Sequence, residues 1–323
     1  MKKKNYGHLK VVAIGGGTGL SSLLMGLKEY INNISAVVTV TDDGGSSGRL
    51  TKAYGILPPG DIRSCLVSLA KEDNFMSQLF SYRFPGKSDI AGHSFGNLFI
   101  MAMSEVFGGF EHGILESSRV LAITGKVMPA TLKRVVLNAE LEHGKIVVGE
   151  TNISKSSQNI NRVFLTPSNT KALPEVITVL RQADVVVLGP GSLYTSIIPN
   201  LLIKDIAKEL KRVKAKKIFV CNIMSQPGET DTYTAEDHLE ILIKHIGQGI
   251  VDYMIVNNVI VPKRLLNRYK KEGSFPVKYS SKKKVFGVKK VLGNLFGSSI
   301  SKNAKYARHD PKKLAGKILE ITV

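Results

Sequence analysis

The stretch that decides the fold is Val11-Val12-Ala13-Ile14-Gly15-Gly16-Gly17-Thr18-Gly19-Leu20. Its first four residues are apolar and carry no charge, as in a strand that is buried on both faces of a parallel sheet. Four glycines follow within five positions, and leucines then recur at helical spacing, at positions 20, 23, 24 and 27. The order strand, glycine turn, helix predicts an α/β fold with a Rossmann-like, doubly wound and mostly parallel sheet.

The glycine turn is a candidate phosphate site. Glycine lets the backbone turn sharply and approach a ligand closely, and the helix just beyond offers unpaired N–H groups to an anion. The dinucleotide fingerprint is incomplete because Leu20 stands where its third glycine belongs, and a tight turn without a ligand is the alternative. We predict nucleotide contacts at Gly15, Gly16, Gly17, Thr18 and Gly19.

A second polar turn follows the next predicted strand, residues 35–41. Asp42 occupies the position where a doubly wound fold places the acid that accepts the ribose hydroxyl. Asp43 is a candidate ligand of Mg²⁺ bound together with the nucleotide, since Mg²⁺ takes carboxylates plus ligand phosphates. Ordinary turn chemistry is the alternative explanation of this Asp-Asp-Gly-Gly sequence. Further nucleotide contacts are predicted in the rest of the turn, at Ser46, Ser47 and Arg49.

A third turn repeats the pattern of the first. Residues 183–188 are typical of a buried strand, and Gly189-Pro190-Gly191-Ser192-Leu193-Tyr194-Thr195-Ser196 opens the next helix. Strand ends from both halves of a doubly wound sheet converge on one crevice, so this turn is predicted to bind a second phosphate. Two such turns indicate a diphosphate between a nucleoside and another group, as in a nucleotide sugar or a dinucleotide. The predicted contacts are Gly189, Gly191, Ser192, Leu193 and Thr195.

Three side chains between these turns are further candidates. Asp61 has the chemistry of a helix N-cap and is also, like Asp43, a candidate catalytic or metal-binding acid. Arg63, in the first turn of the same predicted helix, is expected to reach a ligand phosphate or to pair with Asp61 or Asp43. Asn97 is expected to bond the base or sugar of the ligand, whereas His93 is more simply a capping or hydrogen-bonded histidine.

The positive charge of the chain is concentrated near its C-terminus. The formal net charge is +19, and residues 262–323 contribute 17 Lys and Arg against 3 Asp and Glu. Residues 11–261 carry 24 against 23, so this region is almost neutral and no nucleic-acid surface is expected in it. Cys65 and Cys221 lack metal-type spacing, which favours reduced thiols and a cytoplasmic location. No apolar run approaches the length of a membrane span.

Composition predicts how the chain is divided. Residues 1–261 are expected to form the nucleotide-binding α/β domain, with an antiparallel hairpin insert at about 133–151 and a last core strand at 253–258. Residues 262–323 are expected to form a basic segment that packs on this domain or extends from it. Within it, residues 282–296 place apolar residues on one face of a predicted helix. Docking of that helix on its own domain, on a protein partner or on an anionic membrane surface stays open, as does homo-oligomerisation.

Five motifs together resemble the bacterial gluconeogenesis factor family, which is related to 2-phospho-L-lactate transferase. They are Ile14-Gly-Gly-Gly-Thr-Gly-Leu20, Thr39-Val-Thr-Asp-Asp-Gly-Gly-Ser-Ser-Gly-Arg49, Pro59-Gly-Asp-Ile-Arg63, His93-Ser-Phe-Gly-Asn97 and Leu188-Gly-Pro-Gly-Ser-Leu-Tyr-Thr-Ser196. The resemblance covers about residues 11–258. It implies a Rossmann-like fold, a nucleotide-sugar ligand such as a UDP-sugar, and a role in cell shape, cell-wall precursor balance and growth on gluconeogenic carbon sources.

Three functions fit these residues to different degrees. A regulator would bind a nucleotide sugar between the turns at 15–19, 42–49 and 189–195. A Mg²⁺-dependent transferase of the 2-phospho-L-lactate transferase type would use a nucleotide-diphosphate donor, with Asp43 or Asp61 on the metal. A nicotinamide dehydrogenase is weakest, since the fingerprint glycine is missing and only His93 offers acid–base chemistry. No nucleophile–base pair follows from the spacing. The resemblance, which is nearer to the gluconeogenesis factors than to the transferases, favours the regulator over an enzyme, and the basic C-terminal segment adds support because a charged surface suits a partner or membrane.

Overall fold

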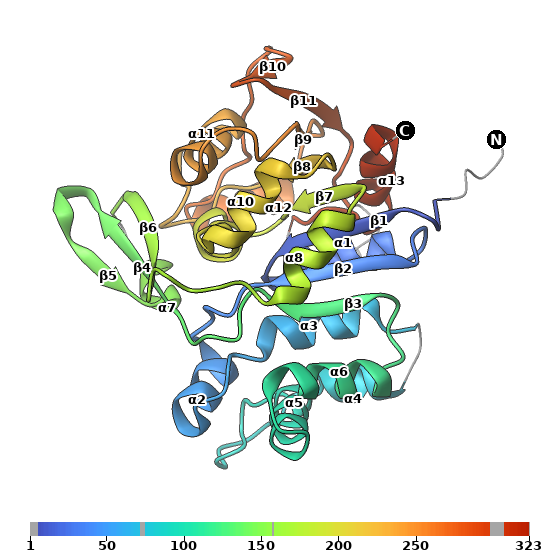
Figure 1. The fold of residues 1–323 in the computed structure, drawn as a ribbon. Helices are drawn as coiled ribbons and strands as arrows, with labels where there is room; N and C mark the ends of the chain where they lie inside the picture. The colour runs from blue at the N-terminus through green and yellow to red at the C-terminus, as the bar shows by residue number, and fades with distance from the viewer. Residues whose placement is uncertain (1–5, 72–74, 157, 298–306, 323) are drawn as a thin grey trace.

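The computed structural model describes residues 6–71, 75–156, 158–297 and 307–322, and Figure 1 shows their fold. A large sheet has the strand order β10-β11-β9-β8-β7-β1-β2-β3, and all neighbours except β10 and β11 are parallel. The α/β fold with a mostly parallel sheet is therefore confirmed. The strand bounds are β1 Lys10–Gly15, β2 Asn33–Val38, β3 Lys126–Pro129, β7 Val185–Leu188, β8 Lys216–Val220, β9 Tyr253–Asn257, β10 Lys284–Val285 and β11 Val288–Gly293.

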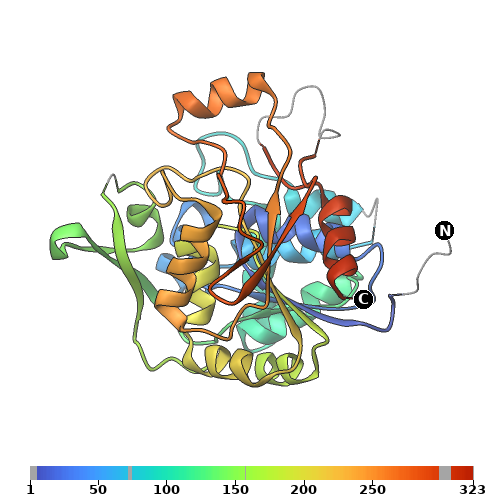
Figure 2. The same ribbon diagram turned by 90° about the horizontal axis from the view of Figure 1, so that it is seen from above.

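Helices cover both faces of this sheet, as the two ribbon views show (Figures 1 and 2). In β1, Val11 and Ala13 pack into one apolar core, whereas Val12 and Ile14 pack into the other, so the strand is apolar throughout. The first core receives side chains from α1 (Gly17–Leu27), α3 (Gly60–Leu69), α4 (Phe75–Ser81), α5 (Phe95–Val106), α6 (Phe110–Val120) and α13 (Pro311–Thr322). The second receives them from α7 (Glu150–Ile153), α8 (Pro174–Gln182), α9 (Ile198–Leu201), α10 (Lys204–Arg212) and α11 (Ala235–Ile246).

The order of the sheet reverses between β1 and β7. From β1 the chain adds β2 and β3 on one side, and from β7 it adds β8 and β9 on the other. Ligands of open α/β sheets bind beside the carboxyl ends of the strands at such a reversal. The turn after β1 leads into α1, and β2, which ends at Val38 and is shorter than predicted, leads into α2 (Gly45–Tyr54). The glycine turns of the sequence therefore lie at the edge where a ligand is expected.

A second, antiparallel sheet has the strand order β5-β4-β6. Strands β4 (Val136–Leu141) and β5 (Ile146–Val148) form the predicted hairpin, with the short 3-10 helix η1 (Glu142–Gly144) at its tip. The insert is larger than the predicted 133–151, because β6 (Ile160–Thr166) pairs with the other edge of β4. A lone two-stranded hairpin is marginally stable in water, and the third strand provides the wider apolar face that the hairpin lacks.

The prediction of a helix at residues 282–296 is wrong. Residues 284–293 form β10 and β11, joined by a two-residue turn at Phe286 and Gly287. Both turn residues have positive φ, 49° and 83°, which is the conformation that closes a tight antiparallel hairpin. Strand β11 then pairs in parallel with β9, so the strand predicted to be the last of the core is followed by another. The predicted membrane contact therefore loses the helix on which it depended.

The C-terminal helix α13 packs against α1. Leu314 and Ile318 are fully buried in the same core as the leucines of α1. Gly26 of α1 meets the backbone of Pro311 so closely that an added Cβ would lie 1.9 Å from Pro311 O. A smaller apolar cluster, which contains Met224 and Phe296, is covered by side chains of α12 (Lys263–Lys271). The described part of the basic segment thus contributes two strands, β10 and β11, and the core helix α13.

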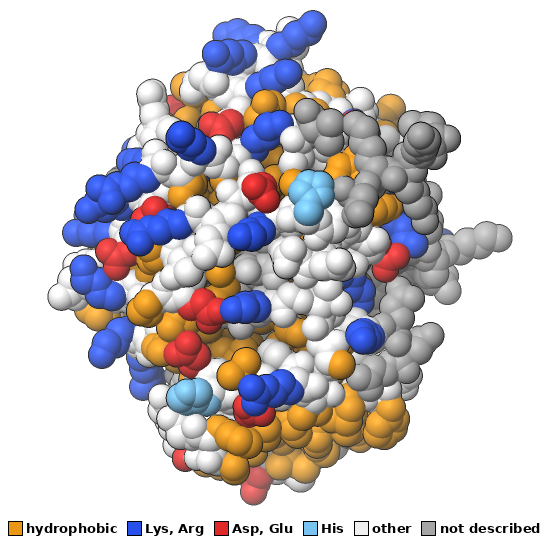
Figure 3. All heavy atoms as spheres, turned by 45° about the vertical axis from the view of Figure 1, so that its right-hand side comes forward, with side chains coloured by type: hydrophobic (Ala, Val, Ile, Leu, Met, Phe, Trp, Pro, Cys, Tyr) orange, Lys and Arg blue, Asp and Glu red, His pale blue; other side chains and the backbone are white. Residues whose placement is uncertain are grey.

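No helix within the described ranges is long and apolar enough to cross a membrane. Figure 3 shows Lys and Arg side chains spread over one face, with apolar side chains gathered along its lower edge. In Figure 1 that end of the molecule is formed by α4, α5 and α6. Homo-oligomerisation stays a prediction. The exposed large apolar side chains in and beside these helices include Phe75, Val106, Phe107, Leu115 and Val120.

Candidate functional site

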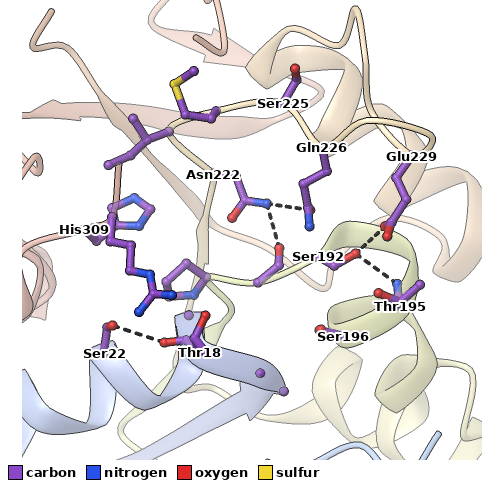
Figure 4. A pocket seen from close by; sticks show the side chains of 18 of the residues that line it. Thr18, Ser22, Ser192, Thr195, Ser196, Asn222, Ser225, Gln226, Glu229 and His309 are labelled. Carbon is purple, nitrogen blue, oxygen red and sulfur yellow. Dashed lines mark hydrogen bonds between the residues drawn. The ribbon is translucent and has the colours of Figure 1, made fainter. Parts of the chain in front are cut away.

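A cleft of about 440 Å³ opens at the carboxyl edge of the large sheet, and Figure 4 shows it from close by. Its lining combines hydroxyl, amide and backbone groups with apolar side chains. The lining residues come from the start of α1 (16–19 and 22), from α7 and its end (150 and 154), from the turn after β7 (190–192, 195 and 196), from the loop after β8 (222–226 and 229), and from the C-terminal segment (269 and 307–309).

The two glycine turns touch each other through their backbones. A Cβ added to Gly19 would lie 2.4 Å from Pro190 O and 3.1 Å from Gly191 N. Gly16 is similarly confined, since its added Cβ would lie 2.5 Å from Asp61 Oδ2. The lack of side chains at both glycines therefore lets the start of α1, the turn after β7 and Asp61 meet at one place.

Helix α1 begins within the glycine turn, at Gly17, and its N-cap residue Gly16 has no side chain to bond the first turn. The Gly17 N–H donates to the Asp61 carboxylate. The N–H groups that follow in the first turn have no partner inside the helix, because the first four donors of any α-helix lack one. These donors, at the positive end of the helix dipole, form one side of the cleft and suit an anion.

The turn after β7 enters a short π-helix, η2 (Leu193–Ile197). Ser192 caps it, since the Ser192 hydroxyl accepts a hydrogen bond from Thr195 N at 3.4 Å. The same hydroxyl donates to Glu229, whose carboxylate also accepts from Ser154 Oγ at 3.1 Å. Burial, the largest cause, raises the pKa of Glu229 above its ordinary value. Glu229 therefore ties the turn after β7 to the loop after β8 and to the residues that follow α7.

The structure separates the predicted nucleotide contacts into three groups. Gly15 ends β1 and Gly189 lies beside it, immediately behind the cleft wall, while Leu193 is fully buried in the core. The lining contains Gly16, Gly17, Thr18, Gly19, Gly191, Ser192 and Thr195. Outside the lining lie Asp42, Asp43, Ser46, Ser47, Arg49, Arg63 and Asn97.

Two of the outlying positions, Ser46 and Asn97, belong to a polar network with His93 at the start of α2. Ser46 Oγ lies 2.9 Å from His93 Nδ1 and accepts a hydrogen bond from Asn97 Nδ2 at 3.0 Å. His93 is a buried, hydrogen-bonded histidine. Its burial, followed by the charges of the nearby arginines, chiefly Arg49, lowers its pKa. Ser94 is the residue that caps α5. The network holds α2 against the start of α5.

Asp42 and Asp43, the acids of the second turn, also accept hydrogen bonds from other groups of the protein. Asp43 accepts hydrogen bonds from the backbone N and the hydroxyl of Thr151, at 2.8 and 2.6 Å, and thereby fixes the start of α7. Asp42 accepts from Gly44 N at 2.9 Å, which is ordinary turn chemistry. Ser47 Oγ accepts from Gly60 N at 3.1 Å and links α2 to the start of α3.

Asp61 is not the N-cap of α3. Pro59 occupies that position, and Asp61 lies in the first turn, turned toward the glycine turn of α1. Burial and then the charge of Asp42 raise the pKa of Asp61 to about 6. Arg63 donates to Ser64 Oγ at 3.0 Å, and no ion pair joins it to Asp61 or Asp43 within the described ranges.

Known proteins are similar to this chain in sequence and in fold. The sequence model of 2-phospho-L-lactate transferase CofD matches residues 11–296. A gluconeogenesis factor of Halalkalibacterium halodurans is 46% identical over 321 residues, which cover 99% of this chain and 97% of the relative. The chain belongs to the gluconeogenesis factor family. The gluconeogenesis factor of Bacillus subtilis is 44% identical over 313 residues, which cover 97% of this chain and 98% of that one.

The gluconeogenesis factor family resemblance inferred from the five motifs is thus confirmed, and a solved structure confirms the fold. The crystal structure of a protein from Bacillus halodurans, 44% identical in sequence, aligns with a TM-score of 0.91 and covers 96% of this chain and 98% of that chain.

Glu150 is a candidate site residue of this gluconeogenesis factor family member that sequence analysis missed. It begins α7, lines the cleft and accepts a hydrogen bond from Thr41 Oγ1 at 3.1 Å. Burial, followed by the negative charges of Asp61 and Asp42, raises the pKa of Glu150 to about 9. At neutral pH Glu150 is therefore an uncharged hydrogen-bond donor. Its place after a glycine at the end of a hairpin gives no signal of such a role.

Other lining residues that are not among the predicted nucleotide contacts come from segments that the fold brings together. The loop after β8, residues 224–231, lies at the carboxyl edge of the sheet, where parallel-sheet topology places it. No sequence rule points to the residues that precede α13. The lining residues with polar side chains outside the predicted contacts include Ser154, Asn222, Gln226, Glu229 and His309.

A Mg²⁺ ion that shares ligand phosphates with the carboxylates near the glycine turn stays a prediction. Within the described ranges, no group of three or more His, Cys, Asp and Glu side chains could hold a metal ion. Asp43, the predicted metal ligand, is committed to α7. Asp42 and Asp61 lie near enough to interact, and Mg²⁺ in nucleotide sites commonly takes one or two carboxylates plus phosphates. Such an ion would neutralise phosphate charge.

Replacing Glu150 by Gln is expected to make the free energy of unfolding depend less on pH. The folded-state pKa of about 9 exceeds the ordinary 4.5, so Glu150 takes up a proton on folding between these values. Its contribution to stability is therefore lost as the pH rises through that window. We expect Glu150→Gln to stabilise the protein by about 1–2 kcal/mol at pH 8, with little effect near pH 4.5.

Denaturant unfolding at a series of pH values measures this effect. Glu105→Gln, at an exposed position outside the cleft, serves as the matched control and should change the unfolding free energy little at any pH. An equal stabilisation by Glu150→Gln at pH 4.5 and pH 8 would show that the raised pKa is not its cause.

Proposed function

We propose that this protein binds a nucleotide sugar of the UDP-sugar type and acts as a cytoplasmic regulator. In this proposal it is needed for cell shape and cell-wall precursor balance during growth on gluconeogenic carbon sources. The observation that carries the binding proposal is the backbone contact between the two glycine turns at the reversal point of the sheet, beside an open cleft. The names of the relatives support the link to gluconeogenic growth.

A diphosphate matches the groups on the two turns. The first turn of α1 offers backbone N–H donors, and the turn after β7 offers the hydroxyls of Ser192 and Thr195. Because the turns are in contact, one phosphate on each would be adjacent, as in a diphosphate. Uncharged Glu150, on a third side of the cleft, adds a donor that does not repel an anion. The cleft has room for more than the phosphates, so groups on both ends of a diphosphate are expected to fit.

The cleft is better suited to binding than to covalent catalysis. Among the hydroxyls of its lining, that of Ser192 is held by two structural bonds, one from Thr195 N in η2 and one to Glu229. The serine–histidine pair of the described residues, Ser46 with His93, lies outside the cleft lining. A serine bound to an adjacent imidazole would be the usual sign of an activated nucleophile. Its location away from the cleft supports a regulator.

Thermal unfolding with a ligand panel tests the proposal. We expect UDP-glucose or UDP-N-acetylglucosamine to stabilise the protein by about 1.4 kcal/mol at ten times its Kd, because a ligand of the native state stabilises by mass action. The ligand should be recovered chemically unchanged. GDP-linked compounds, NAD and NADP, each with and without Mg²⁺, complete the panel. A shift with NAD or NADP alone would contradict the proposal, as would no shift with any nucleotide.

The alternative is a Mg²⁺-dependent transferase of the 2-phospho-L-lactate transferase type with a nucleotide-diphosphate donor. Two observations favour it: the match of that family's model over residues 11–296, and the cluster of Asp42, Asp61 and Glu150 beside the glycine turn. Burial is the largest cause of the raised pKa values of Asp61 and Glu150, and the negative charge of Asp42 raises both further; a bound cation would favour the charged forms. Under this alternative, thermal stabilisation by a GDP-linked donor requires Mg²⁺, and the donor is consumed when an acceptor is present.

A further inference from the structure

Helices α5 and α6 bury small and polar residues and leave larger apolar side chains within reach of water. The buried residues of the two helices are Gly96, Asn97, Ile100, Ser104, Gly113, Ile114 and Ser117. The half-buried or exposed apolar residues include Leu98, Met101, Ala102, Met103, Val106 and Leu115. A helix that is apolar on its outer as well as its inner face is normally covered on both faces.

The close packing of the two helices explains this arrangement. A Cβ added to Gly113 of α6 would lie 2.4 Å from Ser104 Oγ of α5, so the helices approach each other through small residues. No large side chain fits between them at this point. Glu105 is the one charged residue of α5. The outer surface of the pair is therefore built largely from apolar side chains of the kind that interfaces bury.

A groove of about 440 Å³ opens beside the turn that joins α5 to α6. Its lining comes from the end of α2 (55–57), from the end of α5 and the turn after it (104, 105 and 108–110), and from Leu132. Figure 1 shows α2, α5 and α6 at the same end of the molecule. Four apolar side chains and three glycines line the groove together with Ser104 and Glu105. A Cβ added to Gly55 or Gly108 would meet no atom within 4 Å, so space is open at both glycines.

Two apolar side chains project directly beside this groove. Val106 exposes 74% of its surface and Phe107 exposes 46%, and in the chain they lie between the lining residues Glu105 and Gly108. Phe107 does not line the groove itself. An apolar cavity of about 150 Å³ already binds benzene, so the groove has room for a phenyl ring. One surface thus carries both a projecting ring and a hollow that can receive one, which is what a two-fold contact between copies requires.

Charge favours a second copy of the chain over other occupants of this surface. The formal net charge is +19, so two copies repel each other over much of their surfaces. Residues 95–120 carry one Lys or Arg against three Asp and Glu, so contact through this region brings little positive charge together. The same shortage of Lys and Arg disfavours an anionic membrane or a nucleic acid. An apolar surface is instead typical of permanent dimers.

We propose that the protein forms a two-fold symmetric dimer through the α5–α6 turn, in which Phe107 of each copy enters the groove of the other. A stable interface buries about 800 Å² per partner, which is more than two side chains supply. The outer faces of α5 and α6 beside the turn provide the rest. The groove and the cleft share no lining residue, so the dimer leaves the cleft open and does not depend on its ligand.

Sedimentation velocity of the ligand-free full-length protein over a concentration series tests the inference. We expect wild type to sediment as a species of twice the 35.2 kDa of one chain. Phe107→Glu places a carboxylate in each apolar groove and should raise the dimer Kd at least about a hundredfold. Added salt should strengthen the wild-type dimer, because it screens the repulsion between two positively charged copies.

Phe286→Glu is the matched control. Phe286 is 48% exposed in the turn between β10 and β11, outside the proposed interface, so this variant should dimerise with a Kd within about twofold of wild type. Circular dichroism verifies that each variant is folded. A wild type that stays monomeric throughout the series overturns the inference, as does equal dimerisation of Phe107→Glu and wild type. Equal losses in Phe107→Glu and Phe286→Glu overturn it as well.

A mixture of two variants tests whether Phe107 enters the groove of the other copy. Leu132, at 43% exposure, lines the groove, so Leu132→Lys alone should also be monomeric. When Leu132→Lys is mixed with Phe107→Glu, one unaltered ring can enter one unaltered groove, and on the other side the new carboxylate faces the new amine. We expect the mixture to form heterodimers. Failure of the two folded variants to associate would overturn the reciprocal contact.

Discussion

A methyl group added at Gly19 is expected to weaken nucleotide-sugar binding at least about a hundredfold. The added Cβ of Gly19→Ala would overlap Pro190 O at 2.4 Å and press on the Gly191 backbone. Neither neighbour is a flexible side chain, so the two turns must separate. Separation moves the donors at the start of α1 away from the hydroxyls of Ser192 and Thr195. A rigid diphosphate that spans both turns then loses its contacts with one of them.

Gly15→Ala is the matched control for this prediction. A Cβ at Gly15 would meet its nearest atoms, in Gly189 and Leu20, at 3.8 Å, which is ordinary contact. Calorimetric titration with UDP-glucose should give a Kd for Gly15→Ala within about twofold of wild type. Circular dichroism and denaturant unfolding verify that Gly19→Ala is folded under the conditions of the titration. Wild-type affinity in a folded Gly19→Ala protein would show that the ligand does not span the two turns.

Gly26→Ala is expected to lower the free energy of unfolding by about 3 kcal/mol. Here the added Cβ would lie 1.9 Å from Pro311 O and 2.5 Å from Pro311 C, at the contact between α1 and α13. Backbone atoms of one helix would have to move away from the other. The buried apolar contacts of Leu314 and Ile318 with the leucines of α1 would loosen with them.

Gly316→Ala, in α13 itself, provides the matched control for Gly26→Ala. No atom lies within 4 Å of a Cβ added there, and alanine favours helix more than glycine does. This variant should be more stable than wild type, by about 0.5–1 kcal/mol. Urea unfolding followed by circular dichroism measures both variants. A Gly26→Ala protein as stable as Gly316→Ala would show that α13 does not pack on α1 as described.

The parts of the fold that sequence could predict are those encoded locally. The strand–glycine–helix stretches after β1 and β7 each combine an apolar run, glycines and a helical leucine spacing within a short segment. Parallel-sheet topology then brings the two turns to the same edge without further information. This logic located the lining residues Gly16–Gly19 and Ser192 and left the precise role of each untested.

The incorrect or missing predictions have two causes. Either the apolar residues of a segment fit both the helical and the strand periodicity, or a residue reaches the cleft only through contacts with segments far away in sequence. In residues 284–293, apolar residues alternate with lysines closely enough to suit a helix face as well as a strand. The tight turn at Phe286 and Gly287 instead joins two antiparallel strands, which a continuous helix would not allow. The helix N-cap role predicted for Asp61 failed because helix α3 begins before it. Glu150 and His309 could not have been found, because only the tertiary fold brings α7 and the segment before α13 to the cleft.

The packing of α13 on α1 has a consequence for how the protein is made. During translation α1 leaves the ribosome early, whereas α13 and the segment that carries His309 are synthesised after every strand of the sheet. Until then the leucines of α1 that α13 covers face water or another protein, and nascent chains with exposed apolar surface are prone to aggregate. The nascent chain is therefore expected to stay a client of ribosome-associated chaperones until its final helix emerges. The cleft is complete only once the segment that carries His309 has been synthesised.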